Sequence, residues 1–228
     1  MPRRLLAALL LLLAACAVPG EPPALRPATE VQWEPQGAPR ALIVAVHGFN
    51  DFKGAFKEFG AYAAAQGILV EAYDQPGFGA RPDRGHWPGT AALVAALLTA
   101  VQDARERHPG LPVYVLGESM GAAVALMAQA GADTRPVDGL ILVAPAVWNG
   151  RDLPPGYLAV LRVLSALVPS LRIHGHHLKR MASDNIEMLR ALGQDPLYLR
   201  ETRIDGIAGL VNLMVEAQTV APRVGVPM

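Results

Sequence analysis

Four apolar runs recur along the chain, and each one ends at a turn rich in glycine, proline or polar residues. The runs are Ala41–Val46, Gly67–Tyr73, Pro112–Leu116 and Gly139–Val143. Short apolar runs bounded in this way are typical of strands that are buried on both faces, as in parallel sheets. The pattern therefore predicts four core strands.

Helical spacing of apolar residues fills the stretches between these runs. The predicted helices are Phe52–Gln66, Thr90–Arg107 and Met120–Gln129. Strands that alternate with helices imply right-handed crossovers and a parallel sheet. We therefore expect an α/β fold, with a mostly parallel sheet and helices on both faces, in residues 30–147.

After Pro145 the pattern changes to helices and loops without strands. The predicted helices are Tyr157–Val168, Ile186–Leu192 and Gly206–Gln218. Asp184, with Glu187 three residues later, has the form of a capping box that starts the second helix. We interpret residues 148–220 as a helical cap over the sheet. A helix as apolar as the first of these is typical of burial against the sheet, or it could contribute to an acyl-chain site.

The N-terminus combines two arginines, an apolar run and a single cysteine. The run Leu5–Leu13 is too short to span roughly 30 Å of hydrocarbon, so residues 1–15 are predicted to be an export signal. Leu13–Cys16 resembles the bacterial lipobox, which implies acylation of Cys16 and a membrane anchor. Ala17, rather than Asp, follows the cysteine, and by the same resemblance this implies the outer membrane, facing the periplasm. Residues 16–29 are Pro-rich and predict a tether. A plain signal peptide with an incidental cysteine is the alternative.

Composition narrows the classes of partner and cofactor. The chain has 228 residues, with 20 basic and 20 acidic side chains and a single cysteine. Zero net charge without a basic run argues against nucleic acid as a partner, and one cysteine excludes an internal disulfide or a cysteine zinc cluster. The histidines at 174, 176 and 177 are interpreted as a chance group in a loop. We therefore expect neither a metal nor a cofactor, and the oligomeric state is left open.

A candidate nucleophile lies between the third predicted strand and the helix that follows. Gly117–Gly121 reads Gly-Glu-Ser-Met-Gly, the G-x-S-x-G pattern, which exposes Ser119 on a sharp strand-to-helix turn. Gly117 and Gly121 are expected because side chains would collide in so tight a turn. The backbone N–H of Met120 would then form one half of an oxyanion hole.

His47, Gly48 and Phe49 follow the first core strand, where this architecture places the other half of the oxyanion hole. The backbone N–H of Phe49 is the predicted second donor, and each donor contributes roughly 3 kcal/mol. His47 precedes Ser119, whereas the hydrolase order is serine, acid, histidine. We therefore interpret His47, together with Gly48, as a support of this loop through hydrogen bonds.

Together these motifs resemble the lysophospholipase, monoacylglycerol lipase and serine aminopeptidase-type branch of the α/β-hydrolases. The segments that carry the resemblance are Val46–Asp51, Tyr73–Gly79, Gly85–Gly89, Gly117–Gly121 and Ser183–Leu189. The resemblance implies a serine hydrolase that cleaves carboxylic esters of lipid-like substrates through an acyl-enzyme on Ser119. Pro76 and Ala122 depart from the usual family residues without touching this chemistry.

The resemblance also implies a catalytic acid and a histidine after the cap. Residues 221–228 look like the entry to the acid-bearing strand, so we expect both groups beyond Met228 and no activity in this chain as given. Asp152 with His174, His176 or His177 is the alternative triad. A non-catalytic, truncated or degenerate lipoprotein and an iminopeptidase-type amide hydrolase are the alternative functions. His86 and Trp87 could line the pocket rim or simply pack.

Overall fold

The computed structural model describes residues 30–131, 137–149, 156–174 and 183–228. The predictions for Cys16, the export signal, the tether, Asp152, His176 and His177 lie outside these residues. The strands are β1 (Glu30–Trp33), β2 (Ala41–Val46), β3 (Ile68–Tyr73), β4 (Val113–Glu118), β5 (Gly139–Val143), β6 (Arg172–His174) and β7 (Glu201–Arg203). The helices are η1 (Lys53–Phe56), α2 (Lys57–Ala65), α3 (Thr90–Arg107), α4 (Met120–Gly131), α5 (Tyr157–Leu167), α6 (Ile186–Gln194), α7 (Ile204–Val220) and η3 (Ala221–Arg223).

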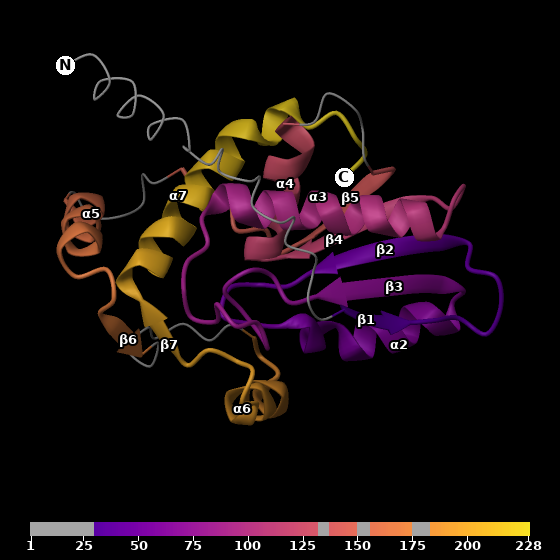
Figure 1. The fold of residues 1–228 in the computed structure, drawn as a ribbon, viewed down its shortest axis with the longest axis horizontal. Helices are drawn as coiled ribbons and strands as arrows, with labels where there is room; N and C mark the ends of the chain where they lie inside the picture. The colour runs from indigo at the N-terminus through magenta and orange to yellow at the C-terminus, as the bar shows by residue number, and fades with distance from the viewer. Residues whose placement is uncertain (1–29, 132–136, 150–155, 175–182) are drawn as a thin grey trace, which may run out of the picture.

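The main sheet has the strand order β1-β3-β2-β4-β5 (Figure 1). Its last four strands are parallel, as the sequence predicts, and β1 pairs antiparallel with β3. The sequence did not predict β1, because a four-residue edge strand is too short to show a clear period. The α/β prediction itself is confirmed.

Helices cover both faces of this sheet, and β2 shows why its sequence is continuously apolar. Leu42, Val44 and Val46 pack into the core formed with α3, α4 and α7. Ile43 and Ala45 face the other way, toward η1 and α2. Successive side chains of a strand point to opposite faces, so a strand with two buried faces needs apolar residues throughout.

The far edge of the sheet is formed by β5. Ile141 and Val143 are exposed there. The Leu140 N–H donates to the carbonyl oxygen of Pro227 at 2.9 Å, so the segment after α7 runs beside the start of β5. The described part of the chain contains no helix long and apolar enough to cross a bilayer.

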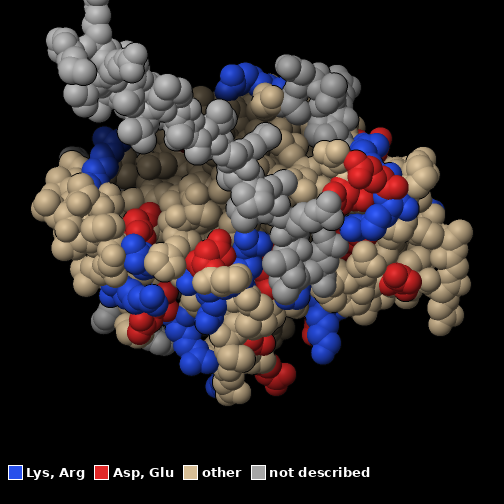
Figure 2. Space-filling view, viewed as in Figure 1, with Lys and Arg blue, Asp and Glu red and all other residues tan. Residues whose placement is uncertain are grey.

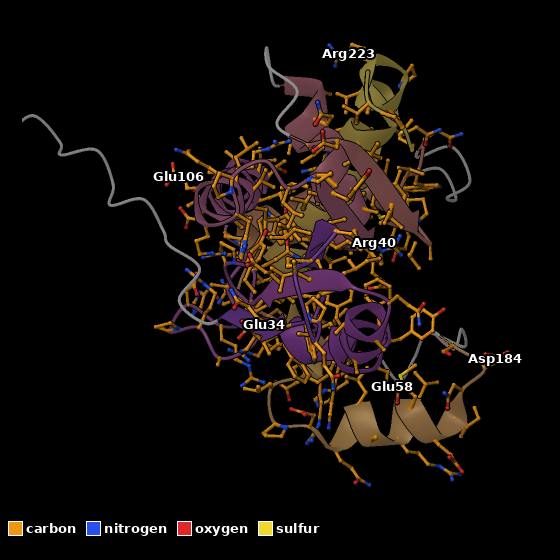
Figure 3. The ribbon with its side chains drawn as sticks, turned by 90° about the vertical axis from the view of Figure 1, so that its right-hand side faces the viewer. Glu34, Arg40, Glu58, Glu106, Asp184 and Arg223 are labelled. Atoms are coloured by element: carbon orange, nitrogen blue, oxygen red, sulfur yellow. The ribbon has the colours of Figure 1, made fainter. Side chains whose placement is uncertain are left out.

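The cap differs from the sequence prediction in two respects. It contains a two-stranded antiparallel sheet, β6 with β7, where no strand was predicted. Both strands have three residues and mixed polarity, so no apolar period marks them. In addition, Asn185 rather than Asp184 caps α6: its side-chain oxygen accepts from the Met188 N–H at 3.0 Å. Figure 3 shows Asp184 in the segment that leads into this helix, at the edge of the molecule.

The cap helix α5 is not buried against the sheet, so the first of the two alternatives given for this helix is wrong. It packs against α7, and Leu161 is its one buried residue. In turn α7 packs against α4, with Leu213 and Ala217 fully buried. Helix α5 therefore reaches the core through α7 and lies on the outside of it (Figure 1).

Candidate active site

Ser119 occupies the turn between β4 and α4 in a conformation that is rare for a residue with a side chain. Its φ is +52°, in the left-handed region. Its N–H donates to the carbonyl oxygen of Val143 at 2.9 Å, and its own carbonyl accepts from the Ala146 N–H at 3.0 Å. The turn is thus held on one side by β5 and continues into α4 on the other. This bonding stabilises the strained conformation.

The two glycines around Ser119 have no room for a side chain. A Cβ on Gly117 would lie 2.5 Å from the Ala122 nitrogen, and a Cβ on Gly121 would overlap the carbonyl oxygen of Val46. The collision within the turn that the sequence predicts is confirmed at Gly117. At Gly121 the obstacle is the backbone of β2, so the absence of a side chain there lets the start of α4 pack against the end of β2.

The loop after β2 lies directly against the serine. A Cβ on Gly48 would lie 3.4 Å from the Ser119 Cβ and would overlap the Glu118 carboxylate. Within the described residues, the N–H groups of Phe49 and Met120 donate to no other protein atom. Met120 is the first residue of α4, where helical N–H groups have no partner inside the helix. One of these unpaired N–H groups belongs to the residue after Ser119, and the other to the residue after Gly48, which lies against Ser119.

His47 is completely buried, and both of its ring nitrogens are engaged. Nε2 accepts from the Gln75 N–H at 3.0 Å, and Nδ1 lies 2.8 Å from the Gly48 carbonyl oxygen, to which it donates in the matching tautomer. Burial lowers the pKa of His47 to about 4, although its hydrogen bond to Gly48 acts in the opposite direction. A neutral imidazole bonded in this way cannot accept the Ser119 proton. It holds the loop that carries Phe49.

Two carboxyl groups lie beside the same loop, and neither was assigned a role from the sequence. Burial raises the pKa of Asp51 to about 6; the Phe52 N–H lowers it and Asp195 raises it further. Burial also raises the pKa of Glu118, and the charge of Asp51 adds to this effect. The position of Glu118, next to Ser119 in the motif, was the one signal in the sequence that could have pointed to it.

The same loop is bonded to the cap. Asn50, with φ +66°, donates from Nδ2 to the Thr202 hydroxyl at 2.7 Å, and its carbonyl accepts from the Leu199 N–H at 2.9 Å. Arg84 also joins core to cap, since it donates to the carbonyl oxygens of Pro196 and Tyr198. The segment before α7 therefore sets the position of the residue that follows Phe49.

Trp87 packs between the core and α7. Its ring lies 6.2 Å from the ring of Phe49, centroid to centroid, and occupies the space that a Cβ on Gly209 would need. These two aromatic rings line a small cavity under the cap together with Asn50, Phe78, His86, Leu199, Thr202, Arg203 and Gly206. Packing, one of the two alternatives for Trp87, is confirmed; Ser119 is not among the residues that line this cavity, so a place at the rim of the substrate pocket stays a prediction.

The family follows from a comparison with known sequences. The profile of the family described as serine aminopeptidase, S33, matches residues 37–228. The chain belongs to this family of hydrolases. The match covers the four parallel strands, the Ser119 turn and the cap, so it includes all the elements that form the site described above.

Individual relatives of this S33-family chain are lipases by name. Human monoglyceride lipase is 28% identical over 200 residues, which cover 86% of this chain and 65% of the human protein. A monoacylglycerol lipase from Mycolicibacterium smegmatis is 30% identical over 177 residues, covering 77% of this chain and 62% of the relative. The chain thus spans less than two thirds of the length of these relatives.

Solved structures show the same fold. The crystal structure of Paleococcus ferrophilus monoacylglycerol lipase superposes with a TM-score of 0.72 at 18% identity, covering 87% of this chain and 74% of that one. A monoglyceride lipase from Saccharomyces cerevisiae superposes with a TM-score of 0.67 at 17% identity, covering 82% and 64%. At these identities the likeness establishes the α/β-hydrolase fold alone.

The histidines of the alternative triad are only partly described. His174 lies in β6, where its Nε2 is 2.9 Å from a Glu201 carboxylate oxygen, and both side chains are largely exposed. Asp152, the acid of this triad, and the alternative histidines His176 and His177 lie outside the described residues. No group of three or more potential metal-binding side chains occurs in the ranges that the structure describes.

The buried carboxyl group of Asp51 should make the free energy of unfolding of this S33-family protein depend on pH. Its pKa is about 6 when folded, against 3.8 for an unperturbed Asp, so its carboxyl favours folding below about pH 4 and this contribution is lost as the pH rises through 6. Asp51→Asn removes the penalty for charging the group. We expect the variant's advantage in free energy of unfolding to grow by up to about 3 kcal/mol between pH 4 and pH 7. Urea unfolding of both proteins at each pH measures it, and an advantage that stays constant would contradict the burial argument.

Proposed function

We propose that this protein is a serine hydrolase that cleaves carboxylic esters of lipid-like substrates, monoacylglycerols or lysophospholipids, through an acyl-enzyme on Ser119. The observation that carries the proposal is the strained Ser119 turn beside two unpaired N–H groups. The names of the relatives support the lipid-like class of substrate.

The geometry supports a mechanism with two stages, formation of the acyl-enzyme and its hydrolysis. The Ser119 hydroxyl attacks the ester carbonyl, and the N–H groups of Phe49 and Met120 donate to the oxygen that becomes negative. Donors that are already in place at this oxygen contribute roughly 3 kcal/mol each to the transition state. The alcohol then leaves, and water releases the acid from Ser119. His47 takes no part in proton transfer in this scheme, because both of its nitrogens are bonded within the loop.

The base that takes the Ser119 proton, and the acid that orients it, are proposed to lie beyond Met228. The bond between Leu140 and Pro227 supports this proposal, because it directs the chain along the open edge of β5. A strand added there would end near Ser119, whose N–H is bonded to the end of β5. The protein that includes these two groups is called the catalytically complete protein below.

A substrate comparison tests the proposal. Monoacylglycerols, lysophospholipids and aminoacyl amides are offered to the 228-residue chain and to the catalytically complete protein. We expect the complete protein to turn over the first two classes, and the 228-residue chain to act no faster than its own Ser119→Ala variant. Preference for aminoacyl amides would instead favour the iminopeptidase alternative. Absence of turnover by the complete protein would favour the non-catalytic alternative.

We further infer that the protein is an outer-membrane lipoprotein facing the periplasm, anchored through Cys16. The support is the lipobox-like segment at Leu13–Cys16 and the Pro-rich stretch that separates it from β1. Two or more acyl chains on one residue suffice for stable anchoring. The mass of the N-terminal peptide tests this, and a peptide without acyl chains would contradict it.

A further inference from the structure

Asn50 directly follows Phe49 in the loop after β2, and its backbone is left-handed. Its φ is +66°, in a region that favours glycine, although asparagine tolerates it better than most residues. The Phe49 N–H is one of the two proposed oxyanion donors, so the conformation of Asn50 sets how the chain leaves that donor. Asparagine therefore brings a side chain to a position where glycine would satisfy the backbone.

Two groups of Asn50 bond to one short segment of the cap. Its Nδ2 donates to the Thr202 hydroxyl at 2.7 Å, and its carbonyl oxygen accepts from the Leu199 N–H at 2.9 Å. Asn50 and Thr202 are both half-buried, so water competes less for this bond than it would at an exposed site. Bonds to two residues of the same segment fix both the place and the direction of this part of the loop.

The cap holds Thr202 in turn, because this residue is the centre of β7. The backbone of β7 pairs with β6. On either side of Thr202, a Glu201 carboxylate oxygen lies 2.9 Å from Nε2 of His174, and Arg203 pairs with Asp205 at 2.6 Å. Figure 2 shows positive and negative side chains next to one another on the surface over β6 and β7. The acceptor of the Asn50 bond thus belongs to a strand that is braced within the cap.

The core holds the Phe49 N–H from the other side. The Gly48 carbonyl belongs to the same planar peptide unit as this N–H, and its oxygen lies 2.8 Å from His47 Nδ1, the donor in the matching tautomer. The Phe49 ring also touches the cap, since a Cβ on Gly206 in α7 would lie 3.6 Å from Phe49 Cζ. The donor is therefore positioned from the core by His47 and from the cap by Asn50.

We propose that Asn50 is a positioning residue for the oxyanion hole: its bond to Thr202 holds the Phe49 N–H where the oxygen of the attacked ester becomes negative. This inference rests on the proposed function, because it requires attack by Ser119 on an ester. A displacement of about 1 Å in a catalytic group can lower a rate roughly a hundredfold. The seating of the cap on the core and the reactivity of Ser119 are coupled through this bond.

Thr202→Val in the catalytically complete protein tests the proposal, because it removes the acceptor and leaves the loop sequence unchanged. We expect kcat on a soluble short-chain ester to fall roughly tenfold and KM to stay within about twofold, since a misplaced donor affects the transition state and not substrate binding. Asn50→Gly keeps the left-handed backbone and should lose as much. The double variant should be no slower than the slower single variant, because both changes remove the same bond.

A trifluoromethyl ketone with a short alkyl chain reports on the oxyanion hole directly. The Ser119 Oγ adds to its carbonyl carbon, the serine proton passes to the base, and the ketone oxygen becomes negative. In Thr202→Val the inhibition constant should rise by the factor by which kcat/KM falls, because the adduct resembles the transition state.

Two further variants separate the bond from packing. Thr202→Ser keeps the hydroxyl and should restore kcat to near the parent value. Thr219→Val is the matched control on α7, where the exposed Thr219 hydroxyl donates to the Val215 carbonyl oxygen of the same helix at 2.9 Å. This control should match the parent in both kcat and inhibition. If Thr202→Val does not fold, Asn50→Gly carries the test, because it leaves the cap unchanged.

Three outcomes would overturn this inference while leaving the proposed function intact. The first is a parent-like kcat in both Thr202→Val and Asn50→Gly. The second is a loss in Thr202→Ser as large as in Thr202→Val, which would assign the effect to packing. The third is a rise in KM without a fall in kcat, which would place Asn50 in substrate binding. Absence of turnover by the parent would instead overturn the proposed function, and this inference with it.

Discussion

Replacing Ser119 with alanine is expected to abolish ester hydrolysis by the catalytically complete protein, lowering kcat about a million-fold. The hydroxyl is the only group in the proposed mechanism that bonds to the acyl carbon. Without it, the Phe49 and Met120 N–H groups can still polarise a bound ester, so a small residual rate above that of water is expected. The measurement is the initial rate on a soluble short-chain ester, followed to low turnover.

A second serine provides the control. Ser170 is exposed in the turn between α5 and β6, away from the Ser119 turn. Ser170→Ala should therefore hydrolyse the soluble ester at the parent rate. If Ser119→Ala kept most of the parent activity, the acyl-enzyme would have to form elsewhere and the proposed function would be wrong in its central residue.

Adding one methyl group at Gly121 is expected to be among the most destabilising changes in the chain. The Cβ would overlap the carbonyl oxygen of Val46, which is backbone at the end of a fully buried strand and cannot rotate away. Either α4 or β2 must shift, and strain of this kind costs about 3 kcal/mol. For a domain of this size we expect the midpoint of thermal unfolding to fall by roughly 10 °C.

Gly131 offers a matched control on the same helix. It is the last residue of α4, and a Cβ there would have nothing within 4 Å. Gly131→Ala should leave stability unchanged or raise it by up to about 1 kcal/mol, because alanine is the better helix former. Calorimetry on the three proteins compares the two positions directly. Equal effects at both would show that helix propensity, and not the contact with Val46, decides the outcome at Gly121.

The parts of the fold that the sequence predicts well are those with two buried faces or a strict helical period. The bounds predicted for β2 and α3 agree with the structure residue for residue, and so do those of β5, although Ile141 and Val143 of that strand are exposed at the sheet edge. Burial on both faces demands an unbroken apolar run, and such a run is visible without knowledge of its neighbours. The short strands β1, β6 and β7 lack that constraint, and none of the three was predicted.

The candidate active site also has one part that the sequence predicts and one part that it does not. Ser119, Gly117 and Gly121 are recognisable because they fall within five consecutive residues of one known motif, although the contact that requires glycine at position 121 is with Val46. The bonds of Asn50 to Thr202 and of Arg84 to Tyr198 join residues more than a hundred positions apart. No spacing in the sequence indicates such pairs, since they depend on how the cap lies on the core.

The amino-acid sequence by itself therefore determined the parallel sheet, the serine turn and the family resemblance, because each rests on steric and hydrophobic constraints between near neighbours. Tertiary structure decided three further points: that His47 is a buried, neutral support, that burial raises the pKa values of Asp51 and Glu118, and that α5 turns its apolar stripe outward. The physical reason is the same for all three. Burial and charge at a residue depend on segments that only folding brings together, and the period of α5 is equally consistent with facing the core or facing away from it.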